Sequence, residues 1–531
     1  PSHGGEPYQA IAPAGPLPLP VIDLDAAEAA AFARSEAVEP FDLVAGPLLR
    51  ATLLKLGAER HVLLLTMHHI VSDGWSMEIL LRELVALYEA FAAGRPSPLA
   101  ELPVQYADFA VWQRKWLGGG ALARQLDYWR RQLAGAPAGL DLPTDFPRPV
   151  VRTLDGATVS AELPAELSAD LKAFCRREGV TPFMLLLAGF DVLLSRYSGQ
   201  QDVLVGSPIA NRNRAETEGL IGFFVNTLVF RADLGAAPTF RDLLRQVRES
   251  ALAAFDRQDL PFETLVGELR PARDLSRSPL FQVLLSVQTL SRELPGMGEV
   301  SLSLLEGDLA TAKFDLSLFV ADAGPALRMT AEYNTGLFEA GTIQRLLEHL
   351  GVLLGAAVSE PESGWRDLPL LTDGERDQLL VGFNETGHTT GPDATLAELF
   401  AAQAARTPER IALVAPGGVR LTYRELDERA GRLALRLRAL GLGSEVLAGV
   451  LMDRTAELIV ALLAIHKAGG AYAPLDPNYP RQRVLLMLET AKAKVLVTRR
   501  HLAADLPAGI QTVFLDPGWE NEPVEISELQ P

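Results

Sequence analysis

A strand, a turn and a helix follow one another directly near the N-terminal end, and this succession constrains the fold more than any other segment. The apolar run 61–67 is typical of a buried strand. Residues 72–74, Ser-Asp-Gly, form a turn cluster, and apolar residues then recur at helical spacing through 75–93. The sequence therefore predicts a strand–turn–helix unit with two histidines, His68 and His69, at its junction.

The two histidines are candidates for chemistry. Because side chains alternate across a strand, only one of them can face a given cleft, and His69 lies nearer the turn and the helix. Neutral imidazole is the usual general base near pH 7. A histidine pair at a strand end is also commonly structural, and Asp73 before a helix is commonly only an N-cap. The spacing alone leaves both interpretations open.

Length and composition narrow the class of protein. The 531 residues suffice for two to four domains, and 48% hydrophobic with 22% charged residues is typical of a globular protein. The net charge of −18, with no basic patch, argues against nucleic acid as a partner. Apolar stretches such as 458–465 are shorter than the roughly 18 residues that span a bilayer. We expect no membrane association and a cytoplasmic location.

The single cysteine, Cys175, excludes an intrachain disulfide. It lies among helical apolar positions, which predicts a small buried hydrophobic side chain. The chain does not begin with Met, and its last residues form no evident closing element, so we expect a piece of a longer protein. No HExxH, CxxC or GxSxG pattern offers a rival catalytic constellation.

Several segments, in order, resemble the condensation domains of nonribosomal peptide synthetases. HHIVSDG at 68–74 is similar to their HHxxxDG signature, which the wider superfamily of chloramphenicol acetyltransferase shares. Further similar segments are YADFAVWQ at 106–113, PTDFPRP at 143–149, GSPIANRNR at 206–214, GFFVNT at 222–227, RDLSRSPLFQV at 273–283 and KFDLSLFV at 313–320. The resemblance extends over about 350 residues.

The resemblance implies an α/β fold: a two-lobed, chloramphenicol-acetyltransferase-like condensation domain with a tunnel between its lobes, followed by an incomplete α/β adenylation subdomain. We expect an N-terminally clipped N-terminal lobe at 1–157 and a C-terminal lobe at 158–355. A linker at 356–395, with one short helix at 373–380, then leads to the N-terminal fragment of an AMP-binding domain at 396–531.

The last segment alternates helical and strand patterns. LTYREL at 421–426 and KAGGAYAPLDPNYP at 467–480 resemble the first two core motifs of amino-acid adenylation domains. Residues 391–531 contain no Ser/Thr/Gly-rich loop that could cradle ATP phosphates. We therefore expect ATP and Mg²⁺ to bind only in a complete adenylation domain, and no adenylation activity from this segment.

The family reaction is attack by the α-amine of one carrier-bound aminoacyl thioester on the thioester carbonyl of another. By resemblance, His69 is the base or the group that positions the amine, and His68 fixes the loop. Asp73 is structural, as an N-cap or through an ion pair for which Arg212 is a candidate partner. Gly74 permits the turn and offers a backbone N–H to the oxyanion.

Asn226, in the GFFVNT segment, is a supporting residue by the same resemblance. No cofactor is expected to be bound covalently and no metal is expected; phosphopantetheine arrives on the upstream donor and downstream acceptor carrier domains. The remainder of the adenylation domain is a further expected partner. The alternative is an inactive scaffold that docks carriers or the rest of the synthetase. Heterocyclising members of the family carry Asp-rich motifs in place of the histidine pair, so the presence of His68 and His69 argues against assigning this chain to them.

Overall fold

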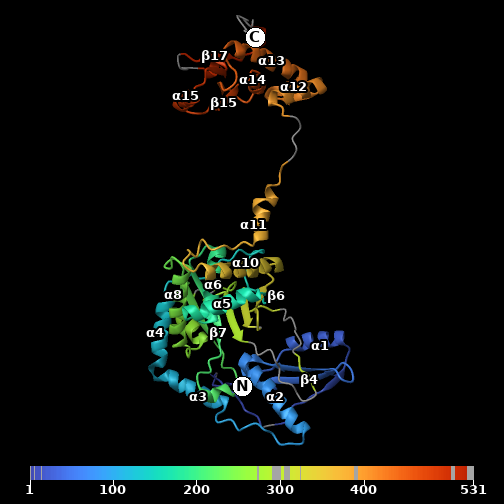
Figure 1. Cartoon of the computed structure of the whole chain (residues 1–531), viewed down its shortest axis with the longest axis vertical. Coiled ribbons are helices and arrows are strands. Elements are labelled where there is room, and N and C mark those ends of the chain that lie inside the picture. The colour runs from blue at the N-terminus through green and yellow to red at the C-terminus, as the bar shows by residue number, and fades with distance from the viewer. Residues whose placement is uncertain are drawn as a thin grey trace. The chain divides into compact units, whose positions relative to one another are not determined.

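The computed structural model describes residues 2–4, 6–13, 15–271, 274–289, 300–303, 311–322, 324–387, 393–503 and 509–522. The chain forms two compact units, Pro1–Asn384 and Glu385–Pro531. In Figure 1 the first unit runs from blue to yellow-orange and the second from orange to red.

The N-terminal lobe of the first unit is a three-stranded sheet with helices beside it. Its strands are β3 (Val21–Asp23), β4 (Leu49–Lys55) and β5 (His61–Met67). β3 is parallel to β4, and β4 and β5 form an antiparallel hairpin. Helix α1 (Ala26–Val38) precedes the hairpin, and α2 (Gly74–Ala92) follows it. The predicted strand–turn–helix unit is thus present.

The C-terminal lobe is built on a six-stranded sheet in the order β6-β11-β10-β9-β7-β8. Strand β9 is parallel to both of its neighbours, and the other pairs are antiparallel. The strands are β6 (Gly156–Glu162), β7 (Asp202–Ile209), β8 (Asn226–Asp233), β9 (Val283–Thr289), β10 (Leu316–Asp322) and β11 (Leu327–Asn334).

Helices cover this sheet and share one core with it (Figure 1). They include α4 (Leu122–Gln132), α5 (Ala165–Glu178), α6 (Pro182–Ser198), α8 (Phe240–Phe255) and α10 (Ala340–Ser359). Helix α6 is buried along most of its length, in keeping with its nearly continuous apolar sequence. Thr181 caps its N-terminus and Pro182 occupies the first turn, as the sequence predicts.

The expected start of the linker differs from the structure. Residues 356–368 are not linker, because α10 continues to Ser359 and both Trp365 and Leu368 are buried in the core of the first unit. The indole of Trp365 also donates to the carbonyl of Leu234 at 3.0 Å. The helix expected at 373–380 is present as α11 (Asp373–Leu380), where Thr372 and Glu375 form a capping box.

The lobe boundary and one strand also differ from expectation. Leu126, Trp129 and Leu142 lie before residue 157 yet pack in the core of the C-terminal lobe, so that lobe recruits chain from both sides of the expected boundary. The apolar segment 220–234 predicts one long strand, but β8 begins only at Asn226. Residues 220–225 instead form a loop that reaches α2, and this loop builds the site described below.

The second unit contains a parallel four-stranded sheet in the order β15-β14-β16-β17, as the alternating pattern predicts. Its strands are β14 (Leu447–Leu451), β15 (Ala471–Leu475), β16 (Val495–Thr498) and β17 (Gln511–Phe514). Its helices are α12 (Leu396–Arg406), α13 (Tyr423–Ala439), α14 (Ala456–Lys467) and α15 (Arg481–Thr490), and β12 (Ile411–Val414) pairs with β13 (Arg420–Thr422).

Within the described residues, no single helix is long and apolar enough to cross a membrane. One pair, α5 and α6, bent by 107° at their junction, meets that test together by length and composition.

Candidate functional site

Helix α2 begins at a buried aspartate. Asp73 has extended backbone torsions, and its Oδ1 accepts hydrogen bonds from the backbone N–H of Ser76 at 2.9 Å and from the Ser76 hydroxyl at 2.7 Å. This is the geometry of an N-cap, in which a side-chain oxygen satisfies a backbone donor of the first turn. The local sequence, Asp-Gly-Trp-Ser, therefore fixes where the helix starts.

Arg212 reaches this cap from the loop after β7, so the expected ion pair is present. Its Nη2 lies 3.0 Å from Oδ1 and 3.3 Å from Oδ2 of Asp73, and the two side chains are 1% and 3% exposed. Nη1 donates to the carbonyls of Thr217 and Leu220, both at 2.6 Å, and the guanidinium lies over the ring of Phe224. One arginine thus joins α2 of the N-terminal lobe to the 211–224 loop of the C-terminal lobe.

Ser76 and Gly222 make a second connection between the lobes. The Ser76 hydroxyl lies 2.9 Å from the Gly222 carbonyl and accepts the Gly222 N–H at 3.0 Å. A Cβ atom on Gly222 would lie 2.4 Å from the ring of Tyr106, so no larger residue fits without displacement. The hydroxyl of Tyr106, on α3 (Tyr106–Trp116), donates to the carbonyl of Phe223 at 2.8 Å.

Asp73 is ionised in this setting. Burial raises the pKa of its carboxyl, but the hydrogen bonds from Ser76 and from the backbone N–H of Phe224, together with the positive charge of Arg212, outweigh burial and hold the pKa below its usual value. The carboxylate therefore remains charged throughout the neutral range.

His69 is oriented by its own turn. Its Nδ1 lies 2.6 Å from the carbonyl oxygen of Ser72, and because a carbonyl can only accept, Nδ1 carries the proton in the neutral ring. Nε2 then bears the free lone pair. The ring packs edge-on against Phe223, with 5.2 Å between centroids, and the residue is exposed. His69 is thus held by one hydrogen bond and one ring contact, and among the described residues nothing hydrogen-bonds to its basic nitrogen.

His68 points elsewhere and serves the loop. Its Nδ1 accepts the backbone N–H of Ile70 at 3.0 Å and so caps the short 3₁₀ helix His69–Val71. Its ring packs edge-on against Phe41 at 5.9 Å between centroids. These contacts are those of a residue that fixes the turn, and they leave His69 as the histidine available for chemistry.

Gly74 is the first residue of α2, and its expected role in permitting the turn is wrong. It is not among the glycines with positive φ, and a Cβ atom there would meet nothing within 4 Å. The turn geometry is therefore open to any residue. The second expected role of Gly74, as a backbone N–H donor, is compatible with its place at the helix N-terminus. The first N–H groups of a helix lack intrahelical acceptors, and the helix dipole favours negative charge there.

Asn226 clamps the start of β8 to a neighbouring loop. Its Nδ2 donates to the carbonyls of Gln258 and Leu260 at 2.8 and 2.7 Å, and its Oδ1 accepts the N–H of Phe262 at 3.0 Å. A cavity of about 200 Å³ lies beside this clamp, lined in part by Tyr106, Asn211, Phe223, Asn226 and Phe262. Asn226 therefore shapes the wall of a cavity that also borders Phe223, the neighbour of His69.

Sequence reasoning missed Ser76, Tyr106, Gly222 and Phe223. Ser76 reads as a neutral position in a helix, and Phe223 reads as one more apolar residue of a strand. The one available signal was the small residue in each segment, since a buried serine or glycine often marks close approach of two backbones. Among the described residues, no group of three or more His, Cys, Asp or Glu side chains could hold a metal ion.

Two α/β lobes that meet at a histidine beside a helix N-terminus form an arrangement that can serve acyl transfer, with a proton acceptor next to groups that favour negative charge. The family model for the condensation domain matches residues 2–380, and the model for AMP-binding enzymes matches residues 400–528. The chain belongs to the condensation-domain family of nonribosomal peptide synthetases, followed by an AMP-binding segment, which confirms the resemblance and the expected fold. Condensation domains of this family are amide-bond-forming, acyltransferase-type enzymes.

Similar curated proteins are large synthetases. Linear gramicidin synthase subunits D and B of Brevibacillus parabrevis are 45% and 49% identical over 99% and 93% of this chain, which spans about a tenth of their length. Phosphinothricin tripeptide synthetase PhsB of Streptomyces viridochromogenes is 42% identical over 97% of the chain and 45% of its own length. A crystal structure of a four-domain nonribosomal peptide synthetase bound to AMP and glycine superposes with a TM-score of 0.77 at 26% identity, covering 94% of this chain and 39% of that one.

Replacement of Arg212 by Leu is expected to destabilise the first unit by about 3–5 kcal/mol, because it leaves a buried carboxylate without its counter-charge. Urea unfolding followed by tryptophan fluorescence measures this, since Trp519 alone among the six tryptophans lies in the second unit. The matched control is Arg131→Leu, which removes an exposed pair with Asp127 and should cost less than about 1 kcal/mol. Equal effects of the two substitutions would show that the buried pair has no special role.

The depressed pKa of Asp73 also predicts a pH dependence. In the unfolded chain the Asp73 carboxyl has the ordinary pKa of 3.8, and in the folded chain its pKa is lower. Below pH 3.8 the unfolded chain therefore binds a proton that the folded chain does not. The stability that Asp73 contributes above that pH is lost as the pH falls through the folded pKa. Unfolding free energies measured between pH 6 and pH 3 should therefore fall more steeply for the wild-type chain than for Asp73→Asn. Parallel curves for the two proteins would contradict the assignment.

Proposed function

We propose that the first unit forms a peptide bond between two carrier-bound substrates. The α-amine of an acceptor aminoacyl thioester attacks the thioester carbonyl of a donor, and the C–S bond breaks. The donor carrier's phosphopantetheine leaves as a thiol, taking up the proton that the amine loses. The donor acyl group becomes the amide-linked N-terminal part of the product on the acceptor carrier. The observation that carries this proposal is the arrangement of His69, whose Nδ1–H is bound by the Ser72 carbonyl and whose Nε2 has no hydrogen-bond partner among the described residues. Such a group can accept a hydrogen bond or a proton from an attacking amine.

The carriers supply the reactive groups. Phosphopantetheine arms of an upstream donor and a downstream acceptor carrier domain bring the two thioesters, and we assign no bound cofactor of its own to the condensation unit. In a full synthetase, the rest of the adenylation domain is a further partner, and ATP with Mg²⁺ belongs to that complete domain rather than to residues 391–531 alone. The cytoplasm, where free thiols such as Cys175 persist, is the proposed location.

Gly74 supports the proposal as a donor to the oxyanion. The tetrahedral intermediate carries negative charge on the former carbonyl oxygen, and the free N–H groups at the N-terminus of α2, together with its dipole, favour that charge. Residue 74 is close in sequence to His69, so one turn would serve both the amine and the oxyanion. Asp73 and Arg212, paired and buried, hold that turn in place.

Replacement of His69 by Ala is expected to lower the rate of dipeptide formation about 10²–10⁴-fold, since it removes the proposed proton acceptor. Mass spectrometry of the acceptor carrier, after mixing with a loaded donor carrier, measures the product. His61→Ala is the matched control, because His61 is an exposed histidine on the same hairpin, and it should retain activity. If the folded wild-type chain makes no dipeptide, it is a scaffold; if both variants keep full activity, His69 has no chemical role.

Gly74→Pro tests the oxyanion donor, because it deletes one amide hydrogen at a position where proline suits the helix. Gly74 is the first residue of α2, and Asp73 before it is extended, as a residue before proline prefers to be. The expected loss in kcat is about 10²–10³-fold. Gly74→Ala keeps the N–H and meets open space, so its rate should lie near that of the wild type. A fully active Gly74→Pro chain, folded by circular dichroism, would remove Gly74 from the mechanism.

A further inference from the structure

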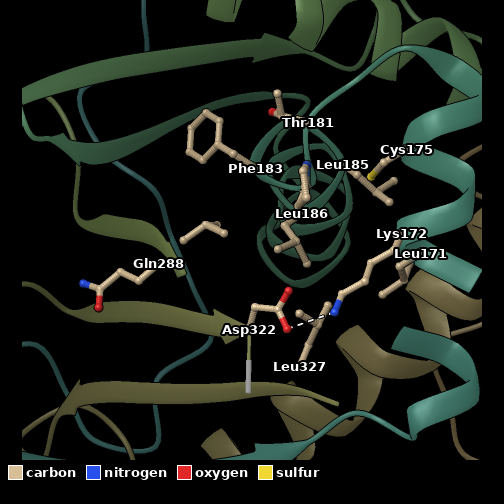
Figure 2. A pocket seen from close by; sticks show the side chains of 12 residues that line it. Leu171, Lys172, Cys175, Thr181, Phe183, Leu185, Leu186, Gln288, Asp322 and Leu327 are labelled. Carbon is tan, nitrogen blue, oxygen red and sulfur yellow. Dashed lines mark hydrogen bonds and ion pairs between the residues drawn. The ribbon is translucent and has the colours of Figure 1, made fainter. Parts of the chain in front are cut away.

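A second cavity, away from His69, lies in the C-terminal lobe between helices α5 and α6 and the ends of β9, β10 and β11 (Figure 2). It is partly enclosed and has a volume of about 200 Å³. Its wall is mainly apolar and includes Leu171, Cys175, Leu185, Leu186, Val287 and Leu327. The volume exceeds the roughly 150 Å³ of a cavity that admits benzene, so a leucine or phenylalanine side chain fits within it.

The charged groups of this cavity are already paired, and the side-chain amide of Gln288 on its wall lies 3.5 Å from the Ser286 hydroxyl. Figure 2 shows Lys172 directed at Asp322, with Nζ 2.9 Å from Oδ1, and Nζ also lies 3.1 Å from the carbonyl oxygen of Gly324. The Thr181 hydroxyl accepts the N–H of Met184 as the cap of α6. No unpaired charge is therefore offered to a ligand by these groups, and a charged group entering the apolar space would lose its hydration. The cavity suits an uncharged, apolar group.

The sheet places this cavity at the same edge as the catalytic turn. Strands β7, β9 and β10 are parallel, and the register that pairs Gly206 with Leu284 sets Ile209, at the end of β7, level with Val287. The chain leaving β7 carries Arg212 to its pair with Asp73. Neighbouring strands are about 4.8 Å apart, and the cavity wall draws on β9, β10 and β11, which lie one, two and three strands to the side of that exit. Ligands of parallel α/β sheets bind beyond the carboxyl ends of such strands.

We propose that this cavity is a specificity subsite that receives the apolar side chain of a carrier-bound aminoacyl or peptidyl group while its reacting end lies at His69. The inference rests on the proposed function, and it names the class of substrate that the unit prefers: aliphatic or aromatic residues rather than charged ones. Donor and acceptor side chains share this chemistry, so the two sources are separated by experiment.

Val287→Phe tests the subsite by filling it. Val287 is partly buried on the cavity wall, and the larger ring occupies the space that a substrate side chain needs. Dipeptide formation is measured with glycyl, leucyl and phenylalanyl donors against one glycyl acceptor, and then with the loading reversed. The variant should lose roughly tenfold or more in kcat/KM for leucyl and phenylalanyl groups on one side of the reaction, with little change for glycyl groups.

The side affected identifies the donor or the acceptor as the source of the side chain. Val151→Phe, at an exposed position, is the matched control and should leave all substrates unchanged. If Val287→Phe slows glycyl and leucyl substrates equally, or slows neither, the subsite is refuted.

Cys175 gives a readout that does not require activity. It is the only cysteine, it lines the cavity, and burial raises its pKa to about 11, so it is a slowly reacting thiol. Modification by methyl methanethiosulfonate is followed by intact mass, with Cys175→Ala as the unreactive control. Leucyl-phosphopantetheine at ten times its Kd should slow the modification of Cys175 roughly tenfold. Glycyl-phosphopantetheine at the same concentration has no side chain to fill the cavity, so it should leave the rate of modification unchanged.

The two readouts separate the inference from the function on which it rests. Protection of Cys175 by the leucyl compound, in a wild-type chain that makes no dipeptide, supports the subsite and refutes the proposed function. Dipeptide formation with no selective protection and no selective effect of Val287→Phe supports the proposed function and refutes the subsite.

Discussion

The buried pair of Asp73 and Arg212 is the interaction on which the rest of the site depends. Asp73 caps α2, accepts the N–H of Phe224 and faces a guanidinium that itself holds the carbonyls of Thr217 and Leu220. Charge, helix start and loop conformation are thus determined by one contact across the two lobes. Without this pair, the helix and the loop would keep the hydrogen bonds between Ser76 and Gly222, and the rest of their contact would be apolar packing, which is non-directional.

His69 inherits its orientation from the same contact. Ser72, whose carbonyl fixes Nδ1 of His69, directly precedes Asp73, and Phe223, whose ring contacts His69, directly precedes Phe224. The imidazole of His69 therefore contacts one residue next to Asp73 and one residue next to Phe224, and Asp73 and Phe224 are hydrogen-bonded to each other across the two lobes. The contacts between Arg212 and His69 therefore run through neighbouring peptide units.

The parts of this arrangement that follow from local sequence were predictable, and the others were not. The β4–β5 hairpin, helices α2 and α5, and the α11 helix with its capping box follow from periodicity and caps within a few residues. The loop 220–225 has the apolar composition of a strand, but its backbone groups bond to Ser76 and Asp73 instead of to a neighbouring strand. Whether residues 220–225 form a loop or a strand thus depends on residues about 150 positions away in the chain, and a local sequence pattern carries no information about them.

The pair is better understood as a device for position than for stability. Removing two charges from water costs several kcal/mol per ion, and an apolar pair of similar volume is often as stable or more so. An apolar pair, however, could not cap α2, bind a backbone N–H and hold two carbonyls at once. The functions that Asp73 and Arg212 perform are directional, and only hydrogen-bonding charges supply direction in a dry interior. The same logic explains why the second cavity is apolar: a subsite that admits different side chains needs shape and dryness rather than directional contacts.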